Sequence, residues 1–122
     1  MATVFRSFDV FLLTSRRESF GRTIFESLAS ATPIVSVIPV GGGRTFIEEA
    51  EGVLRTKERD SEALARLTLE LLQDPARLEQ MGKAGRAWVT RQRYFHVDEW
   101  VMRLEGIYSR LTELTPASGR HV

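Results

Sequence analysis

Residues 10–26 read VFLLTSRRESFGRTIFE, and this stretch decides the fold. It begins with a continuous apolar run, Val10–Leu13, which is typical of a strand buried on both faces of a parallel sheet. From Phe20 to Ala31, apolar residues recur at three- and four-residue steps, as they do on one face of a helix. Because α/β folds are built from buried strands that alternate with amphipathic helices, this stretch predicts an α/β domain.

The strand–helix alternation continues beyond this stretch. A second β-rich run covers residues 34–38, and a weaker third run covers residues 52–55. Between them lie a glycine triplet at 41–43 and a short helical segment at 45–50. With the first strand at about 9–14, we predict a partial Rossmann-like domain with three short parallel strands flanked by helices.

The carboxyl-terminal part of the chain is predicted to be helical. Asp60 can cap a helix at about 61–73, and Asp74-Pro75 places a cap before a proline at the first helical position of a helix at about 75–92. A further apolar repeat from His96 to Leu114 predicts a last long helix.

Composition and charge limit the partners of the chain. Its 122 residues support one modest core, and a net charge of +1 gives no whole-molecule attraction for nucleic acid or for an anionic membrane. There is no cysteine, and no apolar stretch approaches the ~20 residues that span a bilayer. We therefore expect a cytoplasmic protein without a nucleic-acid partner or membrane span, with one domain at 1–114 and a flexible tail at 115–122.

The segment after the first strand carries polar residues suited to a nucleotide. Ligands gather at the carboxyl ends of parallel strands, where the amides of the following helix carry partial positive charge. Gly21 lets a phosphate approach the backbone, while Ser19 and Thr23 add hydroxyl donors. Glu26, beyond the first helical turn, can accept two hydrogen bonds from a ribose, while Glu18 faces the group joined to the phosphates. On spacing alone, a capped helix with two solvated glutamates explains the pattern equally well.

Residues 8–35 strongly resemble the E-x7-E region of retaining GT-B glycosyltransferases of family four, also called glycosyl transferases group 1. That family reads approximately aDvfvlPS-x-x-E-x-F-G-x-x-x-x-E-A-x-A-x-G-x-P-V-V. Gly41-Gly42 is similar to the family's vGG turn, 52–54 to its g-x-L-v strand and 60–86 to its helical tail. The resemblance implies the donor-binding portion of an enzyme that moves a hexosyl group from a nucleotide-diphosphate sugar to an acceptor.

The resemblance also implies roles for individual residues. Glu18 would lie beside the donor sugar as the catalytic carboxylate, and Glu26 would bind the ribose hydroxyls. The family uses no essential metal at this site and no cofactor apart from the donor substrate. The implied substrate-binding residues are Ser19, Phe20 and Gly21 near the sugar and diphosphate, Arg22 and Thr23 at the phosphates, and Glu26.

The chain departs from the family pattern in two residues and in extent. Ala31 replaces the glycine before the T-P pair, and Thr14 replaces the proline before Ser15, both of which are structural changes. The family's amino-terminal acceptor domain and the first strands of its donor domain are missing. A GT-B active site needs both walls of a cleft, so we expect the isolated chain to be inactive. Its expected partner is the missing acceptor domain or a split partner chain.

Several alternatives stay open. The strand at Val10–Leu13 is expected to lack one neighbour, and its exposed edge predicts a homo-oligomer. A non-catalytic binding module that keeps the fold, or a fragment of a GT-B sugar-nucleotide epimerase, would also fit the pattern. Gly41-Gly42-Gly43-Arg44 forms either a second amide nest near the sugar or phosphates, or a plain turn. Arg16-Arg17 fits a solvated surface better than a phosphate contact, and His96 fits capping or packing better than catalysis.

Overall fold

The computed structural model describes residues 2–56, 60–92 and 96–114. The chain divides into two compact units, Met1–Arg91 and Gln92–Val122. The domain predicted over 1–114 spans both units, and the tail predicted at 115–122 lies outside the described residues.

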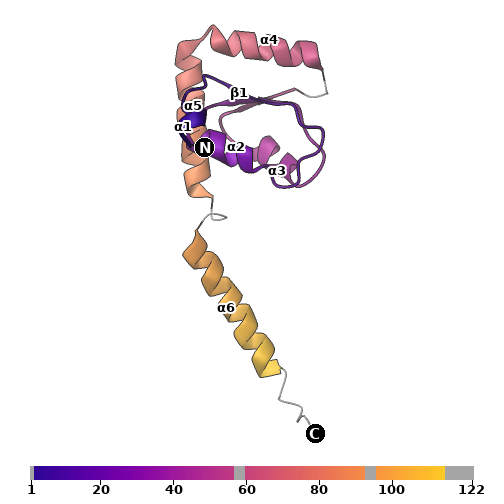
Figure 1. The fold of residues 1–122 in the computed structure, drawn as a ribbon, viewed down its shortest axis with the longest axis vertical. Helices are drawn as coiled ribbons and strands as arrows, with labels where there is room; N and C mark the ends of the chain where they lie inside the picture. Colours follow the sequence, from indigo (N-terminus) through magenta and orange to yellow (C-terminus); the bar gives the residue numbers. More distant parts are fainter. Residues whose placement is uncertain (1, 57–59, 93–95, 115–122) are drawn as a thin grey trace. The chain divides into compact units, whose positions relative to one another are not determined.

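The first unit contains a parallel sheet of three strands, with helices around it (Figure 1); the strand order is β1 (Phe11–Leu13), β2 (Ile34–Ser36) and β3 (Val53–Arg55). Phe11 of β1 lies opposite Ile34 of β2, which in turn lies opposite Val53 of β3. The elements are α1 (Ala2–Phe5), β1 (Phe11–Leu13), α2 (Arg22–Ala29), β2 (Ile34–Ser36), α3 (Gly43–Glu49), β3 (Val53–Arg55), α4 (Ser61–Leu72) and α5 (Pro75–Arg91). The predicted α/β fold with three parallel strands is confirmed; β2 ends two residues earlier than predicted, and the short helix α1 was not predicted.

Apolar side chains form one core on each face of the sheet. Figure 1 shows α4 on one side of the sheet and α2 and α3 on the other. The central strand β2 is buried at every residue, because its side chains alternate between the two cores. The first core contains Leu13, Ile24, Phe25, Leu28, Ile34, Ile47, Ala50, Val53 and Trp88. The second contains Val35, Val37, Leu64 and Leu71.

Helix α5 packs closely on the end of α2 because it carries glycine at two contact positions. A Cβ added at Gly82 would lie 2.3 Å from the carbonyl oxygen of Ala31, and one added at Gly85 would lie 2.7 Å from Cδ2 of Leu28. Ala31 itself has a φ of 60°, in the left-handed region that disfavours a residue with a Cβ. The substitution of alanine at the family's glycine position therefore strains the backbone.

Strand β1 lies at the edge of the sheet, and within the described residues β2 is its one partner. Leu12 on this edge is 46% exposed. It lies beside α4 in an open apolar groove of about 360 Å³, lined by Leu12, Ser61, Leu64, Ala65, Thr68 and Leu69. The predicted open edge is therefore present, while oligomerisation through it stays a prediction.

The second unit contains the helix α6 (Val97–Leu114), as the apolar repeat predicted. The carbonyl oxygen of His96 accepts a hydrogen bond from the Trp100 N–H at 3.0 Å, which places His96 at the start of this helix. Asp98 and Glu99 lie in the first turn, where negative charge is favoured by the helix dipole.

Candidate functional site

The turn between β1 and α2 depends on Gly21. This residue is the N-cap of α2, with φ 76° and ψ 50°, and a Cβ added to it would lie 2.4 Å from Cδ1 of Ile24. Its carbonyl oxygen accepts a hydrogen bond from the Ile24 N–H at 2.9 Å. Among the described residues no side chain caps this helix, so amides at its start can bind solvent or a ligand.

Glu18 lies before this turn, where its backbone is held by the segment that follows β2. The Glu18 N–H donates to the carbonyl oxygen of Val40 at 3.0 Å, and the Gly43 N–H donates to the carbonyl oxygen of Glu18 at 3.0 Å. Arg17 and Val40 also form a parallel bridge. The predicted donor segment and the glycine loop thus meet at the carboxyl ends of two neighbouring strands, the end at which ligands bind in open α/β sheets.

Glu26 lies in the second turn of α2, separated from Glu18 by the glycine turn. The Glu26 side chain is 29% exposed, and its carboxylate lies 3.6 Å from the guanidinium of Arg22, whose side chain is 84% exposed. An exposed ion pair of this kind contributes little free energy, so a ligand can replace it. Ser19 is exposed and Thr23 is half-buried, on either side of the turn.

Phe20 anchors the loop through an aromatic cluster. Its ring stacks on Phe25 and meets Phe46 edge-on, with 5.3 Å between ring centroids in both pairs. Phe25 in turn stacks on Trp88 of α5 at 6.1 Å. Phe20 remains 42% exposed, so the loop is tied to the first core while one part of the ring faces solvent.

Residues 1–88 match the family described as glycosyl transferases group 1. The chain belongs to this family. The match confirms the predicted resemblance and covers every residue of the candidate site.

The chain is similar to bacterial proteins named D-inositol 3-phosphate glycosyltransferase. It is 33% identical over 118 residues to the protein from Xylanimonas cellulosilytica, a match that covers 96% of this chain and 27% of the relative. It is 30% identical over 122 residues to the protein from Thermomonospora curvata, covering 100% of this chain and 27% of that relative. The chain thus spans about a quarter of the length of these relatives.

The family match leaves the roles of the individual site residues as predictions. Structurally, the predicted residues occupy one continuous segment, from the loop after β1 into the second turn of α2, and the glycine loop at 41–43 packs against the start of this segment. The glycine triplet was visible in the sequence, but its contact with Glu18 was not predicted, because the two segments are far apart in the chain.

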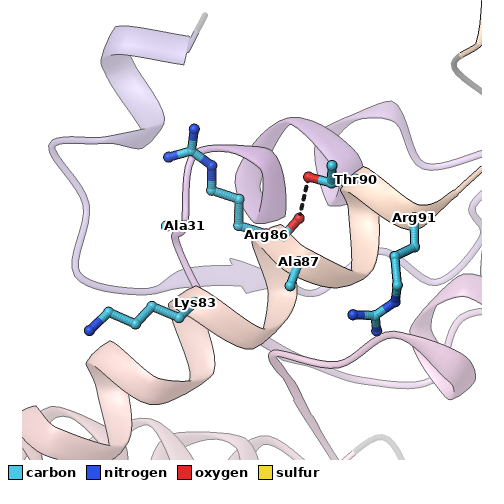
Figure 2. Close-up of a pocket in the computed structure, with 6 residues that line it drawn as sticks. All are labelled: Ala31, Lys83, Arg86, Ala87, Thr90 and Arg91. Atoms are coloured by element: carbon cyan, nitrogen blue, oxygen red, sulfur yellow. Dashed lines mark hydrogen bonds between the residues drawn. The ribbon is translucent and has the colours of Figure 1, made fainter.

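A separate basic depression lies near the other end of α2 (Figure 2). It has a volume of about 640 Å³ and is lined by Ala31, Lys83, Arg86, Ala87, Thr90 and Arg91. Two of its cations are already paired, since Lys83 contacts Glu79 at 2.5 Å and Arg91 contacts Glu51 at 2.7 Å. The hydrogen bond and the charge of Lys83 lower the pKa of Glu79. Both ion pairs are exposed, as is usual for charges on a protein surface.

Within 2–56, 60–92 and 96–114, no three His, Asp or Glu side chains are grouped so that they could hold a metal ion. Among the helices in these ranges, none combines the length and the apolar character that crossing a membrane requires.

Proposed function

We propose that the chain is the donor-binding portion of a retaining hexosyltransferase that uses a nucleotide-diphosphate sugar. The observation that supports this most directly is the position of the Glu18–Glu26 segment. It lies at the carboxyl end of β1, next to the loop that follows β2, and it leads through a left-handed glycine into an uncapped helix. This arrangement offers backbone amides to a diphosphate and carboxylates to the hydroxyl groups on either side of it.

In this proposal each residue binds a different part of the donor. Glu18 faces the sugar as the catalytic carboxylate, and Glu26 accepts hydrogen bonds from the ribose hydroxyls. The backbone of Ser19, Phe20 and Gly21 lies near the sugar and diphosphate, with the amides of Arg22 and Thr23 at the phosphates. The weak contact between Arg22 and Glu26 supports this assignment, because little free energy is lost when Glu26 binds a ribose instead.

The acceptor is assigned to a complementary part of the enzyme, an amino-terminal domain or a split partner chain. The chain spans about a quarter of its relatives' length, and proximity catalysis in a two-domain cleft needs both walls. We therefore expect no turnover by this chain alone. The relatives are named for D-inositol 3-phosphate, so a phosphorylated polyol is the first acceptor to supply when the complementary part is added.

The absence of cysteine supports a cytoplasmic location.

Titration of the full chain with UDP-glucose, GDP-mannose and ADP-glucose tests the proposal by NMR. At least one donor should shift the amide signals of Ser19, Gly21 and Thr23. Glu26→Ala should weaken that binding about tenfold or more, because hydrogen bonds to a charged group are worth ~1.5–3 kcal/mol. Glu70→Ala, at an exposed carboxylate on α4, is the matched control and should change nothing.

If no nucleotide sugar shifts these signals at millimolar concentration, the donor-binding proposal is wrong. The non-catalytic binding module then becomes the better description. If donors bind but Glu26→Ala and Glu70→Ala behave alike, the assignment of Glu26 to the ribose is wrong.

A further inference from the structure

The side chain of Glu18 passes between two glycines that belong to different elements. A Cβ added at Gly43, the first residue of α3, would lie 2.6 Å from Cγ and 2.8 Å from Cβ of Glu18. A Cβ added at Gly21, the N-cap of α2, would lie 3.2 Å from the same Cγ. The methylene stem of Glu18 therefore occupies a slot that exists because neither neighbour has a side chain.

The two preceding glycines of the same loop lie against the backbone of the Glu18 segment and not against the Glu18 side chain. A Cβ at Gly41 would lie 2.5 Å from the carbonyl oxygen of Glu18, and one at Gly42 would lie 2.3 Å from the carbonyl oxygen of Ser19. The hydrogen bond from the Gly43 N–H to the Glu18 carbonyl holds the two segments at this distance. The loop thus sets both the backbone position and the side-chain direction of Glu18.

We propose that Gly43 is a positioning residue that directs the Glu18 carboxylate toward the sugar of the donor. This inference rests on the proposed function, and it adds a residue that acts through Glu18 without touching the ligand. Gly21 contributes the other side of the slot. Its positive φ makes any substitution there a backbone perturbation, which leaves Gly43 as the informative position.

The contacts that Gly43→Ala creates fall on Glu18. The two closest atoms to the new Cβ belong to the Glu18 side chain, while the Glu18 carbonyl oxygen is 3.3 Å away. Rotation of the Glu18 side chain relieves the contact with Cγ, whereas the contact with Cβ, which is fixed to the backbone, requires a small shift of the Glu18 segment or of the loop. Alanine is also the better helix former, so the fold should be retained.

The test compares the unsubstituted 122-residue chain with Gly43→Ala and with Gly106→Ala. Gly106 is the matched control, because it is a helical glycine whose added Cβ would meet no atom within 4 Å. Each protein is titrated with UDP-glucose, GDP-mannose and ADP-glucose, and with UDP, GDP and ADP. Gly43→Ala should weaken binding of the sugar nucleotide roughly tenfold or more while binding of the matching nucleotide stays unchanged.

A double-mutant cycle identifies the route of the effect. If Gly43 acts through Glu18, then adding Gly43→Ala to Glu18→Ala should cause no further loss of sugar-nucleotide affinity. Equal affinity of Gly43→Ala and wild type for the sugar nucleotide would overturn the inference. Loss of nucleotide and sugar nucleotide together would also overturn it, since that result marks a general structural defect.

A measurement without ligand keeps the inference separate from the proposed function. Side-chain scalar couplings report the rotamer of Glu18 in the unliganded chain, and Gly43→Ala should change them while Gly106→Ala should not. If no donor binds the wild type, the proposed function fails and the role toward the sugar fails with it. A changed rotamer would still support the slot geometry, whereas an unchanged rotamer would overturn the slot itself.

Discussion

Replacing Ala31 by glycine should stabilise the first unit. Ala31 has a φ of 60° in the connection between α2 and β2, and its carbonyl oxygen lies against Gly82 of α5. Packing of α5 therefore holds this residue in a conformation that alanine disfavours and glycine adopts freely. The substitution removes the strain without changing the path of the backbone.

One favourable and two unfavourable contributions set the change in the free energy of unfolding. Release from the left-handed region is worth roughly 1–2 kcal/mol, while the added freedom of glycine in the unfolded chain costs about 0.4–1 kcal/mol. Loss of a half-buried methyl group costs a further ~0.3 kcal/mol, less than half of the value for full burial. The expected gain in the free energy of unfolding is about 0.5 kcal/mol, or ~2–4 °C in Tm.

Urea denaturation of the full chain, followed by far-ultraviolet circular dichroism, measures this difference. Ala65→Gly provides the matched control, because Ala65 is an exposed residue in the middle of α4. That change should destabilise by about 1 kcal/mol, the usual cost of glycine in a helix. The two substitutions are identical in chemistry and should have opposite signs. A loss of stability in Ala31→Gly would refute the argument from strain.

Four further substitutions have predicted effects. Gly82→Ala should destabilise by more than ~2 kcal/mol, because its Cβ would meet a backbone oxygen at 2.3 Å, whereas Gly106→Ala should raise the helix content measured by circular dichroism. Asp60→Ala should cost about 1 kcal/mol in urea denaturation, since the Asp60 carboxylate accepts from the N–H groups of Glu62 and Ala63 at 2.9 and 3.0 Å. Leu12→Lys should convert a self-associating chain into a monomer in sedimentation velocity, and a wild type that is already monomeric at micromolar concentration would contradict pairing through β1.

Local signals in the sequence predicted most of the helices and strands. The Asp60 cap and the Asp74-Pro75 pair mark the starts of α4 and α5, because both act within a few residues of the chain. The end of β2 was predicted too late because Val37 and Ile38 extend the β-rich run, whereas the strand ends where its pairing with β1 and β3 ends, at Ser36. The four-residue helix α1 is too short to show a periodicity.

The candidate site was predictable in composition but not in arrangement. Glu18, Gly21 and Glu26 lie in one motif, so their order along a strand, turn and helix follows from local pattern and family resemblance. The contact between Glu18 and Gly43 depends on how far β1 and β2 extend side by side, which is a tertiary property. A glycine triplet alone does not indicate which backbone it approaches.

The central position of β2 also has a consequence for folding kinetics and amide exchange. Ile34 contributes to one core and Val35 to the other, and the backbone of β2 pairs with both neighbouring strands. Its amide protons should therefore exchange with solvent only when the whole first unit unfolds. Both of its partners are distant in the chain, so β2 must close two long loops before either core is complete. Substitutions in this strand should slow folding more than they accelerate unfolding.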